Sequence, residues 1–210
     1  MQSVILIGYS GHAYSVINIF TADRWLLAGY MDDEEKKANP FDLSYLGSEK
    51  NVETLRWHRD TLFFVAVGNN HARRKITQFL QENRILIANA VHPSASVNGI
   101  VAANAGVMIG INAAVNALAE IHEGVICNTG CVIEHECIIN KFAHIAPGAV
   151  LAGNVSIGEE TFIGANAVIR QGVTIGRNVT VGAGSVIIHD IPDNMVVAGN
   201  PGRPLNKTSN

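Results

Sequence analysis

Long apolar runs, charge and cysteine are all scarce in this chain. No stretch approaches the roughly 20 consecutive apolar residues that a membrane-spanning helix needs, although 48% of the residues are hydrophobic. Only 16% are charged, the net charge is -3, and there is no run of Lys or Arg. This excludes the electrostatic footprint of a nucleic-acid-binding protein and of one held on an anionic membrane. We therefore expect small molecules and further copies of the chain as partners.

The three cysteines do not make a disulfide framework, because Cys127, Cys131 and Cys137 are crowded and odd in number. Free thiols of this kind are typical of the reducing cytosol. A zinc site needs a fourth ligand, which His135 or His144 could supply. The repeat described below instead turns the thiols inward as small hydrophobes, so we expect no metal. The N-terminus has no basic segment before its apolar run, which indicates a first strand rather than a signal peptide and hence a cytoplasmic protein.

Residues 1–91 alternate short apolar runs with polar, helix-like stretches. That alternation is typical of βαβ units around a parallel sheet. It predicts strands over 4–7, 25–31, 62–67 and 85–91, and helices over 12–21 and 71–83. The expectation for this segment is a Rossmann-like α/β domain.

From Val97 onward an apolar residue recurs every six positions, and a small or β-branched residue follows four positions after it. A six-residue period is the signature of a parallel β-helix, in which each hexad supplies one short strand and a corner and three hexads complete a coil of about eighteen residues. An ordinary sandwich would need irregular loop lengths instead. We predict an all-β domain over 92–210, with about five coils and a C-terminal tail. The apolar positions are Val97, Ala103, Ile109, Val115, Ile121, Cys127, Ile133, Ile139, Ile145, Leu151, Ile157, Ile163, Ile169, Ile175, Val181 and Ile187.

Four motifs connect both segments to a known family. They are Ile7-Gly8-Tyr9-Ser10-Gly11-His12, Asp32-Asp33, Gly68-Asn69-Asn70 and Glu134-His135-Glu136-Cys137. With the hexad repeat, they resemble the hexapeptide acyltransferases, and within them the sugar O-acyltransferases of the sialic acid O-acetyltransferase type. The run 128–137 is most similar to that of the bacillosamine-pathway enzymes, which N-acetylate a UDP-4-amino-4,6-dideoxy sugar from acetyl-CoA. The resemblance implies this activity, a left-handed β-helix and a homotrimer.

The last of the four motifs, residues 134–137, contains the expected catalytic pair. His135 lies two residues after Ile133, where the repeat places an outward corner, and we expect it to be the general base. Glu136 would orient the imidazole and raise its basicity. Gly153 lies eighteen residues later, one coil above His135, and its N–H is a candidate for the oxyanion donor. Solvated corner side chains, and a glycine that only eases a turn, are the structural alternatives.

The remaining candidates concern binding. The turn around Gly8 follows a strand and opens a helix, so its N–H groups suit a diphosphate, whereas an incomplete GxGxxG makes NAD a poor fit. By resemblance, the UDP-sugar contacts are Ser10, Gly11, His12, Asp32, Asp33 and Gly68, and the acetyl-CoA contacts are His144, Ala165 and Ala183. Because His135 and His144 lie half a coil apart, a site that uses both must form between subunits.

Three other functions stay open from the sequence. The same machinery could O-acetylate sialic acid or another sugar hydroxyl. The β-helix could be a scaffold without catalysis, against which the His135–Glu136 pair argues. A carbonic anhydrase would need three converging metal-binding histidines, for which His122, His135 and His144 are the nominal set. The identity of the sugar and of its nucleotide is not fixed by any motif.

Overall fold

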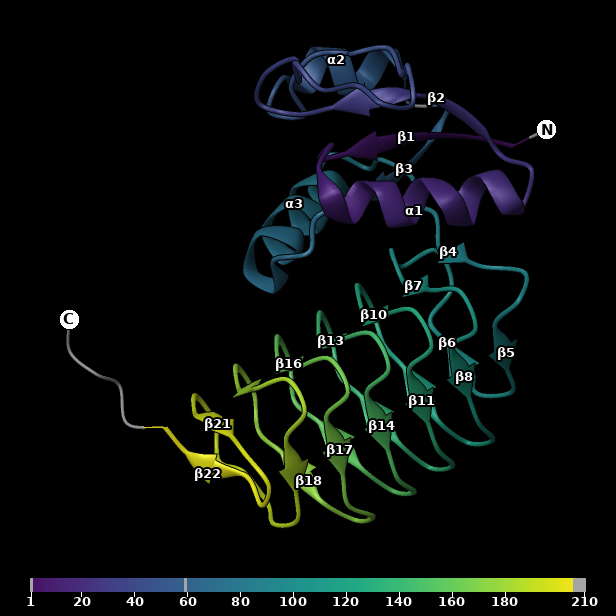
Figure 1. Ribbon diagram of the computed structural model, residues 1–210. Coiled ribbons are helices and arrows are strands. Elements are labelled where there is room, and N and C mark those ends of the chain that lie inside the picture. Colours follow the sequence, from purple (N-terminus) through teal and green to yellow (C-terminus); the bar gives the residue numbers. More distant parts are fainter. Residues whose placement is uncertain (1, 59, 206–210) are drawn as a thin grey trace.

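The computed structural model describes residues 2–58 and 60–205 and shows a small α/β domain seated on one end of a long β-helix (Figure 1). The ends of the two predicted domains, residue 1 and residues 206–210, lie outside the described residues. The predicted class, a Rossmann-like domain followed by a left-handed parallel β-helix, is confirmed. No helix in the described part of the chain combines the length and the apolar character needed to cross a membrane.

A three-stranded parallel sheet in the order β2–β1–β3 forms the centre of the N-terminal domain. The middle strand has the sequence SVILI and is buried on both sides, as is usual for parallel strands covered by helices. The elements in chain order are β1 (Ser3–Ile7), α1 (Gly11–Ala22), β2 (Leu26–Met31), α2 (Val52–Trp57), β3 (Leu62–Val65) and α3 (Asn70–Glu82).

Helix α1 lies between this sheet and the β-helix. Its buried residues Val16 and Phe20 belong to one apolar cluster with Met108 and Ile126 of the β-helix. Helices α2 and α3 cover the opposite face of the sheet, where Leu55 and Leu80 share a second cluster with β1 and β3. The two domains therefore share a continuous apolar contact through α1.

Two local predictions for the N-terminal domain need correction. The short helix α2 was not anticipated; it begins after Asn51, whose side chain accepts hydrogen bonds from the next turn. The strand expected over 85–91 is divided: Ile87 bridges to Phe63 of β3, whereas β4 (Ala90–Val91) already belongs to the β-helix. Between these two segments, the side-chain oxygen of Asn89 accepts hydrogen bonds from the amides of Ala105 and Val107 of the β-helix. These bonds hold the chain at the point where it leaves the sheet and enters the β-helix.

The β-helix is a prism with three faces of parallel two-residue rungs. Face 1 contains β4, β7 (Met108–Ile109), β10 (Ile126–Cys127), β13 (His144–Ile145), β16 (Phe162–Ile163), β19 (Thr180–Val181) and β21 (Val196–Ala198). Face 2 contains β5 (Ser96–Val97), β8 (Ala114–Val115), β11 (Val132–Ile133), β14 (Val150–Leu151), β17 (Val168–Ile169) and β20 (Val186–Ile187). Face 3 contains β6 (Ile100–Val101), β9 (Glu120–Ile121), β12 (Ile138–Ile139), β15 (Ser156–Ile157) and β18 (Thr174–Ile175). A terminal strand, β22 (Arg203–Pro204), pairs antiparallel with β21.

The interior of the prism follows the hexad pattern. Each rung places its second residue inward, so that the large aliphatic residues and the small residues four positions later form one core along the whole helix. Buried polar side chains in the prism form hydrogen bonds with the backbone. The Thr161 hydroxyl donates to Gly176 O at 2.7 Å and accepts from Val179 N. Face 1 has seven parallel rungs, more than the five coils expected, because β4 precedes the predicted series that begins at Val97 and β21 follows its last residue, Ile187.

Candidate functional site

The turn between β1 and α1 has free backbone donors. Gly8 adopts a φ of +88°, and a Cβ there would lie 2.8 Å from Val67 Cγ2, so only glycine fits. Ser10 is the N-cap of α1, but its side chain makes no capping hydrogen bond. The amides of the first helical turn therefore remain available to an anion, which the positive end of the helix favours.

A pocket of about 400 Å³ opens at the carboxyl ends of the strands. It brings together four of the predicted substrate residues, Ser10, Asp32, Asp33 and Gly68. Ligands bind at this edge in open α/β sheets. The pocket also contains residues that the sequence reasoning missed, Glu49, Asn69 and Ile76, which come from loops and from α3.

The two predicted aspartates of this pocket are already partnered. Asp32 accepts hydrogen bonds from Tyr9 N at 3.0 Å and Asp33 N at 2.8 Å, and it pairs with Lys36 Nζ at 2.8 Å. Asp33 pairs with Lys50 Nζ at 2.6 Å. Asp32 therefore holds the Gly8–Tyr9 turn in place, which is a structural contribution in addition to any substrate contact.

His12 and His144 lie side by side although they come from different domains. Their ring centroids are 6.1 Å apart, and the His144 Nε2 is 3.1 Å from Asn128 Nδ2. Burial, reinforced by the positive charge of Arg73, lowers the pKa of His12 to about 4 and that of His144 to about 3. Both imidazoles are therefore neutral at physiological pH. The predicted sugar-binding turn and the predicted CoA contact on face 1 thus meet within one chain.

Arg73 connects the domains at the same place. The side chain is 1% exposed and forms no ion pair with a carboxylate of the described residues; instead, it donates to carbonyl oxygens on both sides. Its Nε bonds Gly124 O and its Nη2 bonds Phe142 O, both at 2.8 Å, while Nη1 reaches Val67 O and Gly68 O at 3.1 Å. The sequence reasoning missed it, although its i, i+4, i+7 spacing with buried Thr77 and Leu80 marks it as facing inward.

The predicted catalytic pair lies on the corner between faces 2 and 3. His135 Nδ1 is 3.0 Å from Glu136 Oε2, and both side chains are about half exposed in the single chain. Gly153 lies over the imidazole, where a Cβ would overlap the ring. The N–H of Gly153 donates no hydrogen bond to any other residue in the described ranges. The corner thus presents a histidine, an orienting carboxylate and an unused backbone donor together.

This corner is separated from the other predicted site residues of the same chain. His144 is on face 1, and Ala165 and Ala183 lie one above the other on the corner between faces 1 and 2. His135 lies on the corner at the opposite edge of face 2. The structure therefore divides the predicted residues into two groups within one chain.

The thiols lie inside the prism, as expected from the repeat. Cys127, Cys131 and Cys137 are unpaired and buried. A hydrogen bond with Cys131 and burial raise the pKa of Cys127, and burial raises that of Cys137, whose Sγ contacts Ala152 O at 3.2 Å. These thiols are poor nucleophiles. Residues 2–58 and 60–205 contain no group of three or more side chains placed to hold a metal ion.

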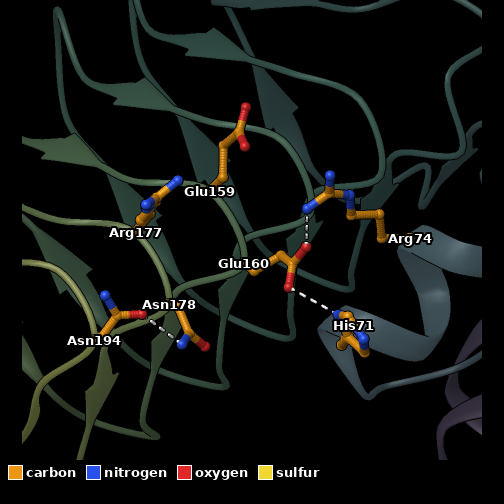
Figure 2. A pocket seen from close by; sticks show the side chains of 7 residues that line it. All are labelled: His71, Arg74, Glu159, Glu160, Arg177, Asn178 and Asn194. Atoms are coloured by element: carbon orange, nitrogen blue, oxygen red, sulfur yellow. Dashed lines mark hydrogen bonds and ion pairs between the residues drawn. The ribbon is translucent and has the colours of Figure 1, made fainter.

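A second hollow of about 310 Å³ lies where α3 meets the corner between faces 3 and 1 (Figure 2). Glu160 bonds Arg74 Nη1 at 2.5 Å and His71 Nδ1 at 3.3 Å, and both partners come from α3. Burial alone would raise the pKa of Glu160, but its bonds to Arg74 and His71 lower it. These contacts attach α3 to the β-helix beside Arg73.

The family models match both segments of the chain. The PglD N-terminal domain matches residues 3–80, and six repeats of the bacterial transferase hexapeptide match residues 154–189. A curated relative, UDP-N-acetylbacillosamine N-acetyltransferase of Bacillus subtilis, is 35% identical over 111 residues. That match covers 52% of this chain and 51% of the relative, so it spans about half the length of the curated protein.

Two solved structures are similar over almost the whole chain. A histidine-to-asparagine variant of perosamine N-acetyltransferase from Caulobacter crescentus, in complex with CoA and GDP-perosamine, is 32% identical with a TM-score of 0.93, covering 99% of this chain and 98% of that one. The acetyltransferase domain of PglB from Neisseria gonorrhoeae, in complex with acetyl coenzyme A, is 36% identical with a TM-score of 0.89, covering 97% and 99%.

Proposed function

This chain belongs to the hexapeptide-repeat sugar acyltransferases with a PglD-type N-terminal domain, and we propose that it transfers the acetyl group of acetyl-CoA to the amino group of a nucleotide-linked sugar. The observation that carries the proposal is the catalytic corner, where Gly153 leaves room beside the His135–Glu136 pair. The strand-end pocket and the free amides of α1 supply a place for the diphosphate of the nucleotide.

The substrate that we propose is a UDP-4-amino-4,6-dideoxy sugar, acetylated at its 4-amino group. The name of the Bacillus subtilis relative supports UDP as the carrier, whereas the Caulobacter crescentus enzyme binds a GDP-sugar. By our assignment, Ser10, Gly11, His12 and Gly68 hold the nucleotide sugar together with Asp32 and Asp33. His144, Ala165 and Ala183 hold acetyl-CoA, with the two alanines offering backbone groups and no bulk.

In the mechanism that we propose, the sugar amine attacks the thioester carbonyl carbon directly. His135 Nε2 takes the proton from the amine as the C–N bond forms, while Nδ1–H donates to Glu136, which fixes the tautomer and stabilises the imidazolium. The free N–H of Gly153 donates to the carbonyl oxygen as it gains negative charge. When the C–S bond breaks, His135 returns the proton to the departing thiolate. The buried cysteines take no covalent part.

We propose that three copies of the chain form a homotrimer with the active sites between subunits. The outward residues of face 2 form an apolar stripe of Ala114, Val132, Val150, Val168 and Val186. Beside it, Leu118 is 67% exposed with a φ of +62°, a conformation that is costly for leucine unless a contact compensates it. A partly exposed apolar stripe that runs along a whole face in this way is typical of a subunit interface.

The trimer also explains the separation of the predicted residues. In one chain, the base His135 and the His12–His144 group occupy different sides of the prism. Packing of face 2 against the next copy would bring the catalytic corner of one subunit to the nucleotide-sugar pocket of its neighbour. The co-substrate and the three unpaired thiols favour the cytoplasm as the compartment in which this trimer works.

A thiol-release assay tests the proposed activity. The purified chain is mixed with acetyl-CoA and one acceptor at a time, either a UDP-, GDP- or dTDP-linked 4-amino sugar, a sugar nucleotide without an amine, or sialic acid. Free CoA is followed with a thiol reagent. We expect release only with a sugar that has a free amine, and a UDP-sugar as the best substrate. Release with sialic acid, or with a sugar nucleotide that lacks an amine, would replace N-acetylation by O-acetylation.

A further inference from the structure

Glu49 is a buried carboxylate without a cation. Its side chain is 8% exposed, and Oε2 has no hydrogen-bond partner among the described residues. Glu49 faces the strand-end pocket and also an adjoining hollow of about 230 Å³ that Ile76 and Phe79 of α3 line. A buried acceptor with no partner is costly, so its retention beside a cavity indicates a ligand that donates to it.

The neighbouring charges do not compensate Glu49. Lys50, the next residue, pairs with Asp33, and Lys36 pairs with Asp32. Burial, helped by the charges of Asp33 and Asp32, raises the pKa of Glu49, and its own backbone N–H and the charge of Lys50 offset this only in part. The carboxylate therefore has unused capacity to accept a hydrogen bond, and a donor that arrives with the ligand would lower its free energy.

The fold indicates which part of a sugar nucleotide reaches Glu49. The diphosphate belongs at the amides of α1, and the reactive sugar must point toward His12 and the β-helix. Glu49 lies two residues before Asn51, the N-cap of α2, and Figure 1 shows α2 on the side of the sheet that faces away from the β-helix. The end of the molecule opposite the sugar, the nucleobase, therefore lies at Glu49 and Ile76.

We propose, resting on the function proposed above, that Glu49 reads the nucleobase by accepting a hydrogen bond from a ring N–H. Uracil offers N3–H and guanine offers N1–H at the corresponding edge, whereas cytosine N3 and adenine N1 carry a lone pair there. A carboxylate only accepts, so at this ring position it favours the N–H of the first two bases and is disfavoured by the lone pair of the last two. Ile76 supplies apolar contact to the base plane.

Calorimetry of the full chain with UDP, GDP, CDP and ADP tests this assignment. We expect the wild type to bind UDP or GDP at least about 10-fold more tightly than CDP and ADP, and the tighter of the two to identify the carrier. Glu49→Gln can present either an acceptor or a donor, so it should lose most of that preference. Glu49→Met should bind all four nucleotides weakly and about equally. Glu34→Gln is the matched control, because Glu34 is an exposed carboxylate in the same segment between β2 and α2, and this variant should bind as the wild type does.

Two results would overturn the proposal. An equal loss of affinity for all four nucleotides in Glu49→Gln would place the carboxylate on the ribose, which they share. Unchanged preference in both variants would remove Glu49 from base recognition. Because nucleoside diphosphates contain no amino sugar and the assay contains no acetyl-CoA, failure of the transferase activity would leave this measurement intact. Melting temperatures equal to or above that of the wild type confirm folding, since Glu49 forms no ion pair with the described residues that the variants would lose.

Discussion

At the scale of single residues, the exposed His135–Glu136 pair and the buried His12–His144 pair have opposite environments. One pair is half exposed and joined by a hydrogen bond of 3.0 Å, which suits a base that must exchange protons. The other is enclosed beside Arg73 and kept neutral. These environments support our proposal that the exposed pair transfers the proton and that the buried pair contacts a bound ligand.

His135→Ala should lower kcat on the order of 10²- to 10⁴-fold, the range expected when a positioned base is removed. Acetyl-CoA affinity should change little. Glu136→Ala should cost less, because the imidazole still accepts a proton in a poorer orientation. His122→Ala is the control, since His122 lies 3.5 Å from Glu120 in a similar exposed pair outside the site. Comparable losses in the control would show that the kinetics report stability instead of catalysis.

Gly153→Ala should lower kcat in the wild type but have almost no effect in a His135→Ala background. The added Cβ overlaps the imidazole of His135 and displaces it, so the loss of kcat should disappear in a chain that lacks the imidazole. A double-mutant cycle on kcat measures the coupling. Additive effects of the two substitutions would mean that Gly153 acts independently of His135.

At the scale of the elements, α3 decides how the N-terminal domain sits on the β-helix. Arg73→Met leaves several buried carbonyl oxygens without a donor, so it should lower the free energy of unfolding by about 3 kcal/mol. Arg74→Met, on the same helix, removes only a partly exposed pair with Glu160 and should cost less than about 1 kcal/mol. Urea unfolding of both variants distinguishes the two contacts, and equal losses would contradict the assignment.

The contact of α1 with β13 should make the fold acid-sensitive. Unfolded His12 and His144 bind protons near pH 6.5, but in the folded chain their pKa values are about 4 and about 3. The unfolded state therefore binds more protons below pH 6.5, and the free energy of unfolding should fall as the pH decreases from about 6.5 toward 4. Denaturant titrations at pH 6.5 and pH 5 measure this, and a His12→Gln/His144→Gln variant should show a smaller decrease.

At the scale of the whole molecule, the site should be complete only in an oligomer. We would mix equal amounts of His135→Ala and His144→Ala chains, unfold them together and refold them. The mixture should recover up to about a quarter of the wild-type activity, because one in four sites between neighbouring subunits then combines an intact His135 with an intact His144. Each variant refolded alone is the control. Mixed trimers that assemble but recover no activity would reject a site shared between subunits.

The hexad period by itself determined the β-helix. Each inward position needs an apolar residue, and apolar residues six positions apart form one continuous core only when the hexads stack as coils. It also fixed His135 beneath Gly153, since eighteen residues make one coil. Only the tertiary structure decided which residues meet across the domains. Arg73 and the His12–His144 contact depend on how α1 and α3 dock against face 1 and its corner with face 3. Glu49 reaches its pocket because the loop before α2 folds beside α3. Long-range packing of this kind leaves no local period in the sequence.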